Sequence, residues 1–132
     1  MKYSVDKQTE YTTFSLAEDN LNSLIAPNLK SEFVLLSNEG VKNLILNLEH
    51  VKFVDSSGLS AILTANRLWK SLGGSFILTG VAHPNVKRLI EISKLDAVLT
   101  IIPTVLESVA YVLMEVLQRE LNSASDDALG DA

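Results

Sequence analysis

Hydrophobic and polar residues change their spacing several times along the chain, and each spacing predicts a different structural element. Residues 2–7 and 11–17 alternate with a period of about two, which is typical of half-buried antiparallel strands. Asp19, Asn20 and Asn22 then predict a turn. The chain is therefore expected to open with two strands that pair with each other.

The first helix is predicted between Pro27 and Gly40. Leu29, Phe33 and Leu36 fall on one face of a helix placed there. Proline suits the first turn of a helix and glycine its end, so the two residues mark its expected limits.

Three short apolar runs predict strands that are covered on both faces. They lie in residues 41–49 (VKNLILNLE), 75–80 (SFILTG) and 97–102 (AVLTII), and Pro103 ends the last of them. Nearly continuous apolar runs suit the buried strands of a parallel sheet better than edge strands.

Helical spacing follows each of these runs. A stripe begins at Leu59 and closes at Gly73-Gly74, Pro84 opens a short helix, and the last helix is expected over about residues 104–121. The order ββαβαβαβα predicts an α/β domain with right-handed crossovers. We expect a four- to five-stranded mixed sheet with about four helices packed on it.

The end of the chain differs from the rest in composition. Residues 123–132 are small, polar and acidic, and they offer no apolar face to bury. We therefore predict a single domain over residues 1–122 and a flexible acidic tail over residues 123–132.

Composition and charge narrow the class of function. The 132 residues are 47% hydrophobic and 20% charged, which suits one globular domain. The net charge of −5 includes Asp126, Asp127 and Asp131, and the absence of a Lys/Arg cluster argues against nucleic-acid binding. No secretory signal or membrane-spanning run is visible. A soluble cytoplasmic protein is therefore expected.

Few groups in the chain could support catalysis or hold a metal ion. There is no cysteine, and His50 and His83 lie in separate connections without metal-ligand spacing. No phosphate-binding glycine loop is present. A hydrolase that uses Ser56 is one hypothesis, but the segment lacks the GxSxG glycine and nothing recommends His83 as the base. We expect no enzyme activity, cofactor or metal.

The segment FVDSSGLSAIL, residues 53–63, is the main candidate for a functional site. Aspartate and serine are preferred helix N-caps, so residues 55–58 could simply begin a helix, and taken alone local physics favours this role. A helix N-terminus also accommodates an anion. A phosphate on a serine here would still add about −1.5 to −2 charge to an exposed turn.

VDSSGLSAIL resembles the phosphorylation motif of STAS domains, specifically those of the bacterial anti-sigma factor antagonist family. The segment NVKRLIEISKLDAVL is similar to the helix before the family's last strand. NLILNLEHVKFV and GGSFILTG match the family in order and spacing. Together the resemblance spans roughly residues 2–121.

The resemblance implies a phosphoprotein that acts by partner switching in the regulation of transcription. The unphosphorylated form would bind an anti-sigma factor with serine kinase activity and release the sigma factor. The kinase would phosphorylate Ser56, and a serine phosphatase would restore the first state. Asp55, Ser56, Ser57 and Gly58 are the implied partner-binding residues, one serine capping the helix while the other is presented. The protein is expected to be a monomer or a weak homodimer.

An alternative is a STAS interaction subunit without phosphorylation, in a transport or signalling assembly. The last helix would suit it, since Tyr111, Val112 and Met114 widen its apolar stripe, although a broad stripe also suits a helix that covers the sheet. Trp69 is expected to be partly exposed near the partner surface, because large aromatic residues often anchor interfaces.

One segment departs from the family pattern. Many members carry a Gly-Glu-Leu-Asp-like run after the second strand, and this chain has Asp19-Asn20-Leu21-Asn22 in its place. Asn22 stands where an aspartate is usual. Either the partner or its contact with this loop is therefore expected to differ.

Overall fold

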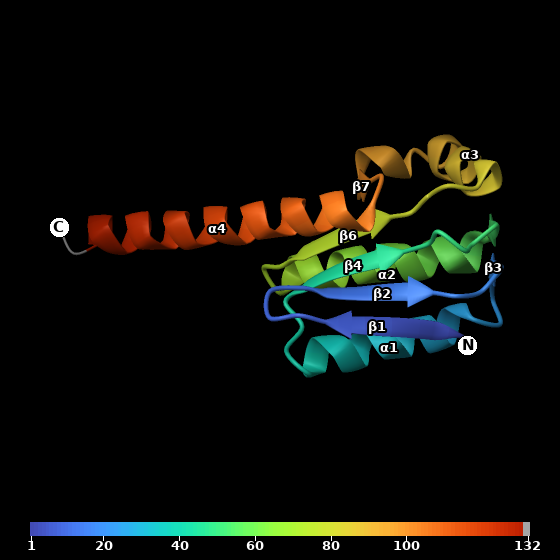
Figure 1. The fold of residues 1–132 in the computed structure, drawn as a ribbon, viewed down its shortest axis with the longest axis horizontal. Coiled ribbons are helices and arrows are strands. Elements are labelled where there is room, and N and C mark those ends of the chain that lie inside the picture. The colour runs from blue at the N-terminus through green and yellow to red at the C-terminus, as the bar shows by residue number, and fades with distance from the viewer. Residues whose placement is uncertain (131–132) are drawn as a thin grey trace.

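Five strands form the main sheet of the computed structural model, which describes residues 1–130, with side chains through residue 125 (Figure 1). They lie in the spatial order β1 (Tyr3–Lys7), β2 (Thr12–Leu16), β4 (Asn43–Asn47), β6 (Ser75–Thr79) and β7 (Thr100–Ile102). The β1 and β2 strands pair antiparallel and the other neighbours pair parallel. The predicted α/β class and mixed sheet are confirmed.

Helices connect the parallel strands and follow the last one. They are α1 (Ala26–Asn38), α2 (Ser56–Ser71), α3 (Pro84–Ile92) and α4 (Val105–Gly130), with a short 3-10 turn η1 (Leu95–Ala97) before β7. Pro27 and Pro84 lie in the first turns of α1 and α3. Gly40 and Gly73 follow α1 and α2 with φ angles of 93° and 76°, which glycine adopts readily.

The sheet separates two hydrophobic layers. Side chains alternate between the faces of a strand, so Leu44 and Leu46 of β4 face the core that α1 and α2 cover, and Ile45 between them faces α4. On the α4 side, Ile45 and Ile77 pack with Val112, which is fully buried. The prediction of strands buried on both faces is confirmed for β4 and β6. It is wrong for the third run, because only Thr100–Ile102 form β7, which lies half-buried at the edge of the sheet with one neighbouring strand.

Trp69 is fully buried in the larger core, so the expected exposure is wrong. Its indole N–H donates to the Val41 carbonyl at 2.9 Å, and its ring meets Phe33 edge-on at 5.8 Å. Trp69 lies two helical turns after Ile62, which is also fully buried. Both therefore lie on the face of α2 that packs on the sheet.

Polar contacts fix the middle of α4 to the sheet. The Arg119 guanidinium donates to the Asn43 side-chain oxygen at 3.1 Å and to the Ser75 hydroxyl. The Ser75 hydroxyl in turn bonds Glu115 at 2.9 Å. Beyond this cluster α4 projects away from the sheet (Figure 1).

The last helix is longer than the sequence predicted. It continues to Gly130, whereas the spacing of apolar residues predicts an end near residue 121. Residues 131–132 lie outside the described part of the chain. Helical hydrogen bonds are local, and residues 122–129 contain no glycine or proline to interrupt them. The helix can therefore extend without packing against the domain.

Removing residues 123–132 is expected to leave the free energy of unfolding within about 0.5 kcal/mol of its original value, because the sequence of this segment offers no apolar face to bury. Thermal melts of the two proteins at equal salt and low protein concentration test this. A truncation of residues 116–132, which also removes Arg119, serves as the comparison that should lower the melting temperature. A drop of many degrees for the shorter truncation would show that the tail docks on the domain.

Candidate functional site

Asp55 begins α2 as its N-cap. Its backbone is extended (φ −98°, ψ −174°), and its carboxylate accepts a hydrogen bond from the Gly58 amide at 3.0 Å. The expectation that one of the serines caps the helix is therefore wrong. An aspartate preceding them takes this position, because its carboxylate reaches the third amide of the first turn.

Ser56 and Ser57 are the first two residues of α2, and they differ in exposure. Ser56 is exposed, whereas Ser57 is half-buried. Within the described residues, no hydrogen bond engages either hydroxyl. The first amide to bond within the helix belongs to Leu59, which donates to the Asp55 carbonyl at 3.0 Å. The Ser56 and Ser57 amides thus belong to the positively polarised end of the helix.

Gly58 holds the first turn of α2 against a second, two-stranded sheet. In that sheet β3 (Asn20–Leu21) pairs parallel with β5 (Phe53–Val54). The Leu21 carbonyl accepts from the Asp55 amide at 3.1 Å, and a Cβ on Gly58 would lie 2.4 Å from that same oxygen. Only glycine fits at this distance, so Gly58 allows α2 to approach β3 closely.

Replacing Gly58 with alanine is expected to destabilise the protein by about 1–3 kcal/mol, because the backbone must move to relieve the overlap. Urea unfolding measures the change. Ser57→Ala, one position earlier, adds no atoms and serves as the matched control. An unchanged urea midpoint for Gly58→Ala would show that the turn adapts without cost.

The two serines line an open hollow of about 430 Å³ between α1 and α2. Ser23, Ala26, Pro27, Lys30 and Ser60 complete its lining. The Lys30 ammonium donates to the Ser60 hydroxyl at 3.2 Å. Lys30 therefore supplies a cation beside the serine cluster.

Sequence reasoning missed Lys30. Ser60 lies one turn after Ser56 on the same face of α2, and this spacing was visible. The position of Lys30 depends on how α1 packs against α2, which no local pattern reports.

Exposed apolar side chains flank the turn. Phe53 of β5 is 53% exposed, and Leu24, in the loop that also supplies Ser23 to the hollow, is 82% exposed. The Phe53 ring lies 5.7 Å from the His83 ring, centroid to centroid. A partner that covers the turn would therefore meet apolar surface beside the serines.

His83 and Asn22 both have local structural contacts. His83 caps α3, accepting from the Asn85 amide through Nδ1 at 3.2 Å, and within the described residues no hydrogen bond joins it to Ser56. The Asn22 side-chain oxygen accepts from the Leu24 amide at 3.0 Å, so it shapes the turn into α1. Nothing in these contacts activates the Ser56 hydroxyl.

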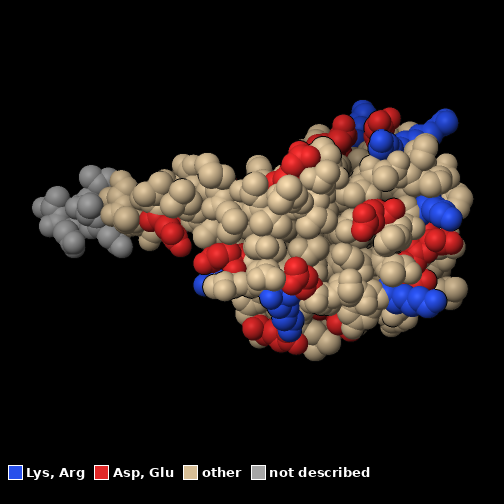
Figure 2. Space-filling model, in the orientation of Figure 1, with Lys and Arg blue, Asp and Glu red and all other residues tan. Residues whose placement is uncertain are grey.

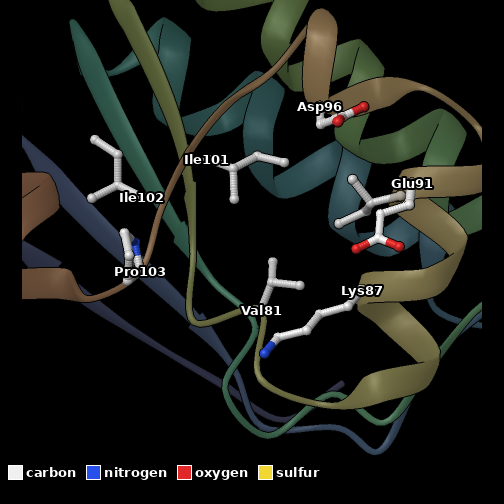
Figure 3. Close-up of a pocket in the computed structure, with 8 residues that line it drawn as sticks. Val81, Lys87, Glu91, Asp96, Ile101, Ile102 and Pro103 are labelled. Carbon is white, nitrogen blue, oxygen red and sulfur yellow. The ribbon is translucent and has the colours of Figure 1, made fainter.

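A second hollow, of about 360 Å³, lies between α3 and β7 (Figure 3). Val81, Ile101 and Pro103 line its strand side, and Lys87 and Glu91 of α3 face them. None of residues 55–58 contributes to its lining, so it is separate from the candidate site.

Charges of both signs are interspersed over the face of the molecule in Figure 2. Among the described residues, no group of three or more His, Asp or Glu side chains is placed to hold a metal ion. The same part of the chain contains no helix that is both long and apolar enough to span a membrane.

Residues 3–108 match the STAS domain family. Among solved structures, a proposed anti-sigma factor antagonist of Thermotoga maritima is 25% identical with a TM-score of 0.73, and the alignment covers 83% of this chain and 93% of that one.

Other solved structures show the same fold at lower identity. The Bacillus cell fate determinant SpoIIAA in its phosphorylated form is 22% identical with a TM-score of 0.64, covering 84% of this chain and 99% of its own. A sulfate transporter family protein of Wolinella succinogenes is 19% identical with a TM-score of 0.65, covering 79% and 85%. The fold thus occurs both in a proposed anti-sigma factor antagonist and in a sulfate transporter family protein.

Proposed function

This chain belongs to the STAS domain family, and we propose that it is a bacterial anti-sigma factor antagonist whose binding is controlled by phosphorylation of Ser56. In its unphosphorylated form it binds an anti-sigma factor that is also a serine kinase, and the sigma factor is released. A serine phosphatase reverses the modification. The protein is not itself an enzyme in this scheme, and it acts in the cytoplasm.

The observation that carries the proposal is the exposed Ser56 hydroxyl at the start of α2. Asp55 caps the helix, so neither serine is needed for that purpose. An exposed hydroxyl that no structural bond occupies is accessible to a kinase. The amides of the first turn and the Lys30 ammonium provide a positive environment for the phosphate that results.

Asp55, Ser57 and Gly58 complete the proposed partner-binding turn with different contributions. Asp55 is exposed and caps the helix, whereas Gly58 is buried and sets the distance between β3 and α2. The exposed Phe53 and Leu24 extend the docking surface with apolar area.

A second candidate is a STAS interaction subunit that is never phosphorylated. The exposed apolar residues of α4 favour it, because they provide a surface for assembly away from the Ser56 turn. This candidate requires that changes at Ser56 leave partner binding intact.

A pulldown from extract of the source cells separates the two candidates. Wild type and Ser56→Asp are used in parallel, with Ser93→Asp as a control that adds the same charge to an exposed serine at the end of α3. We expect wild type and Ser93→Asp to recover a serine kinase of the anti-sigma type and Ser56→Asp to lose it. Recovery of the same partners by all three would reject the switch.

A further inference from the structure

The last helix carries apolar side chains on two opposite sides. On its inner side Val112 is buried against the sheet, with Val109 and Val116 partly buried beside it. On its outer side Leu106 is 80% exposed and Leu121 is 61% exposed. A helix that lies on the surface of a domain normally has a polar outer face. Packing within this domain therefore explains the apolar residues on the inner side of α4 but not those on its outer side.

The outer residues form a continuous stripe, which we call the outer stripe. It consists of Leu106, Ala110, Leu113, Leu117, Leu121 and Ala124, all of which are exposed. At 3.6 residues per turn these positions fall within a sector of about 80°. They follow one another at intervals of three or four residues, which is the spacing of a seam between two packed helices.

The part of the outer stripe from Ala110 to Ala124 is symmetrical about Leu117. Leu113 and Leu121 each lie four residues from Leu117, and Ala110 and Ala124 each lie seven residues from it. An antiparallel helix of the same sequence, aligned at Leu117, would place leucine opposite leucine and alanine opposite alanine. Such a surface is complementary to itself under two-fold rotation, as a symmetric dimer requires.

We propose that the outer stripe is a homodimer interface in which the α4 helices of two copies pack antiparallel about a two-fold axis at Leu117. The proposal does not depend on the role of Ser56, which lies at the start of a different helix.

The projection of α4 beyond the sheet supports a second copy as the occupant. After the Arg119 contacts with Asn43 and Ser75, the helix extends past the domain (Figure 1). A helical segment of this length gains little stability in water without tertiary packing. In the antiparallel arrangement, the projecting part of each α4 lies along the sheet-bound part of the other, so both are covered.

The charges along α4 are compatible with this arrangement. The outer stripe itself contains no charged residue. Glu115 and Arg119 are held on the inner side by Ser75. A second copy of the same chain can therefore occupy the outer stripe, because binding there requires no partner of opposite charge.

Sedimentation equilibrium of the full chain over about 1–200 µM tests the dimer, since a small interface of this kind is expected to dissociate in the micromolar range. Leu117→Glu places two carboxylates against each other at the axis and should raise the dissociation constant about 100-fold or more. Gln118→Glu adds the same charge about 100° around the helix and should leave the dimer intact. Circular dichroism confirms that each variant is folded.

Disulfide crosslinking tests the geometry, because the chain has no cysteine of its own. Oxidised Leu117→Cys should form a covalent dimer, since the axis places the two thiols together. A mixture of Leu113→Cys and Leu121→Cys should crosslink, whereas Leu113→Cys alone should not, because its two copies would be about 12 Å apart along the helix.

Three results would overturn the proposal. The first is a wild-type protein that stays monomeric at 200 µM, the upper limit of the range above; this would also be the result if a membrane or a different protein covered the stripe. The second is an equal loss of dimer in Leu117→Glu and Gln118→Glu. The third is efficient crosslinking of Leu113→Cys alone, which would indicate parallel helices.

Discussion

Phosphorylation of Ser56 is expected to lower the affinity of this protein for its kinase by about 100-fold or more. The phosphate adds about −1.5 to −2 charge to an exposed turn, and an interface that closes over the turn must strip water from it. Lys30 is the one cation among the residues that line the hollow, and it already bonds Ser60. It can offset only part of the added charge.

The site of modification is expected to be Ser56 and not Ser57. Ser56 is exposed and follows Asp55 directly, whereas Ser57 is half-buried within the first turn. Ser57→Ala should therefore still accept phosphate, Ser56→Ala should bind the kinase constitutively, and Ser56→Asp should bind weakly.

Incubation with the partner kinase and ATP, followed by peptide mass mapping, identifies the modified serine. Titration calorimetry of the modified and unmodified proteins then gives the change in affinity. Phosphate found on Ser57 would refute the site, and equal affinity of the two forms would refute the switch.

Trp69→Ala is expected to destabilise the protein by about 3–5 kcal/mol, because it removes the largest side chain of the core. It also leaves the Val41 carbonyl without the indole N–H that donates to it at 2.9 Å. Trp69→Phe keeps most of the contact with Phe33 and Phe76 and should cost less.

Urea unfolding followed by circular dichroism measures these losses without relying on the tryptophan signal. Leu72→Ala is the matched control, because Leu72 lies at the end of the same helix with 55% of its surface exposed. Its effect should be within about 0.5 kcal/mol. A similarly small loss for Trp69→Ala would contradict the core position of the indole.

The error over Trp69 shows what a helical pattern can and cannot report. The sequence located α2 correctly between the Asp55 turn and Gly73. It did not show which side of the helix meets the sheet, because leucines lie on both sides of it. Contact with Phe33 of α1, which is distant in sequence, and with Phe76 of the following strand decided that Trp69 lies inside.

The candidate site also has features that the sequence predicted and features that only the structure revealed. The Asp55–Gly58 segment could be found from its residue types, since capping and close approach are local requirements that aspartate and glycine meet. The structure shows that Asp55 alone caps α2, which leaves both serine hydroxyls free. This depends on the backbone geometry where β5 joins α2, which residue types do not report. Lys30 can be recognised as part of the site only when α1 is placed beside α2.

The sequence by itself determined the order of the main elements, the buried strands β4 and β6 and the start of α2, because these follow from spacing and backbone preference over a few residues. Only the tertiary structure decided the pairing of β3 with β5, whose two residues each are too short to show a period. It also decided which side of α4 meets Ile45 and Ile77 and which side remains open. These features depend on contacts between segments far apart in the chain, and a local pattern has no information about them.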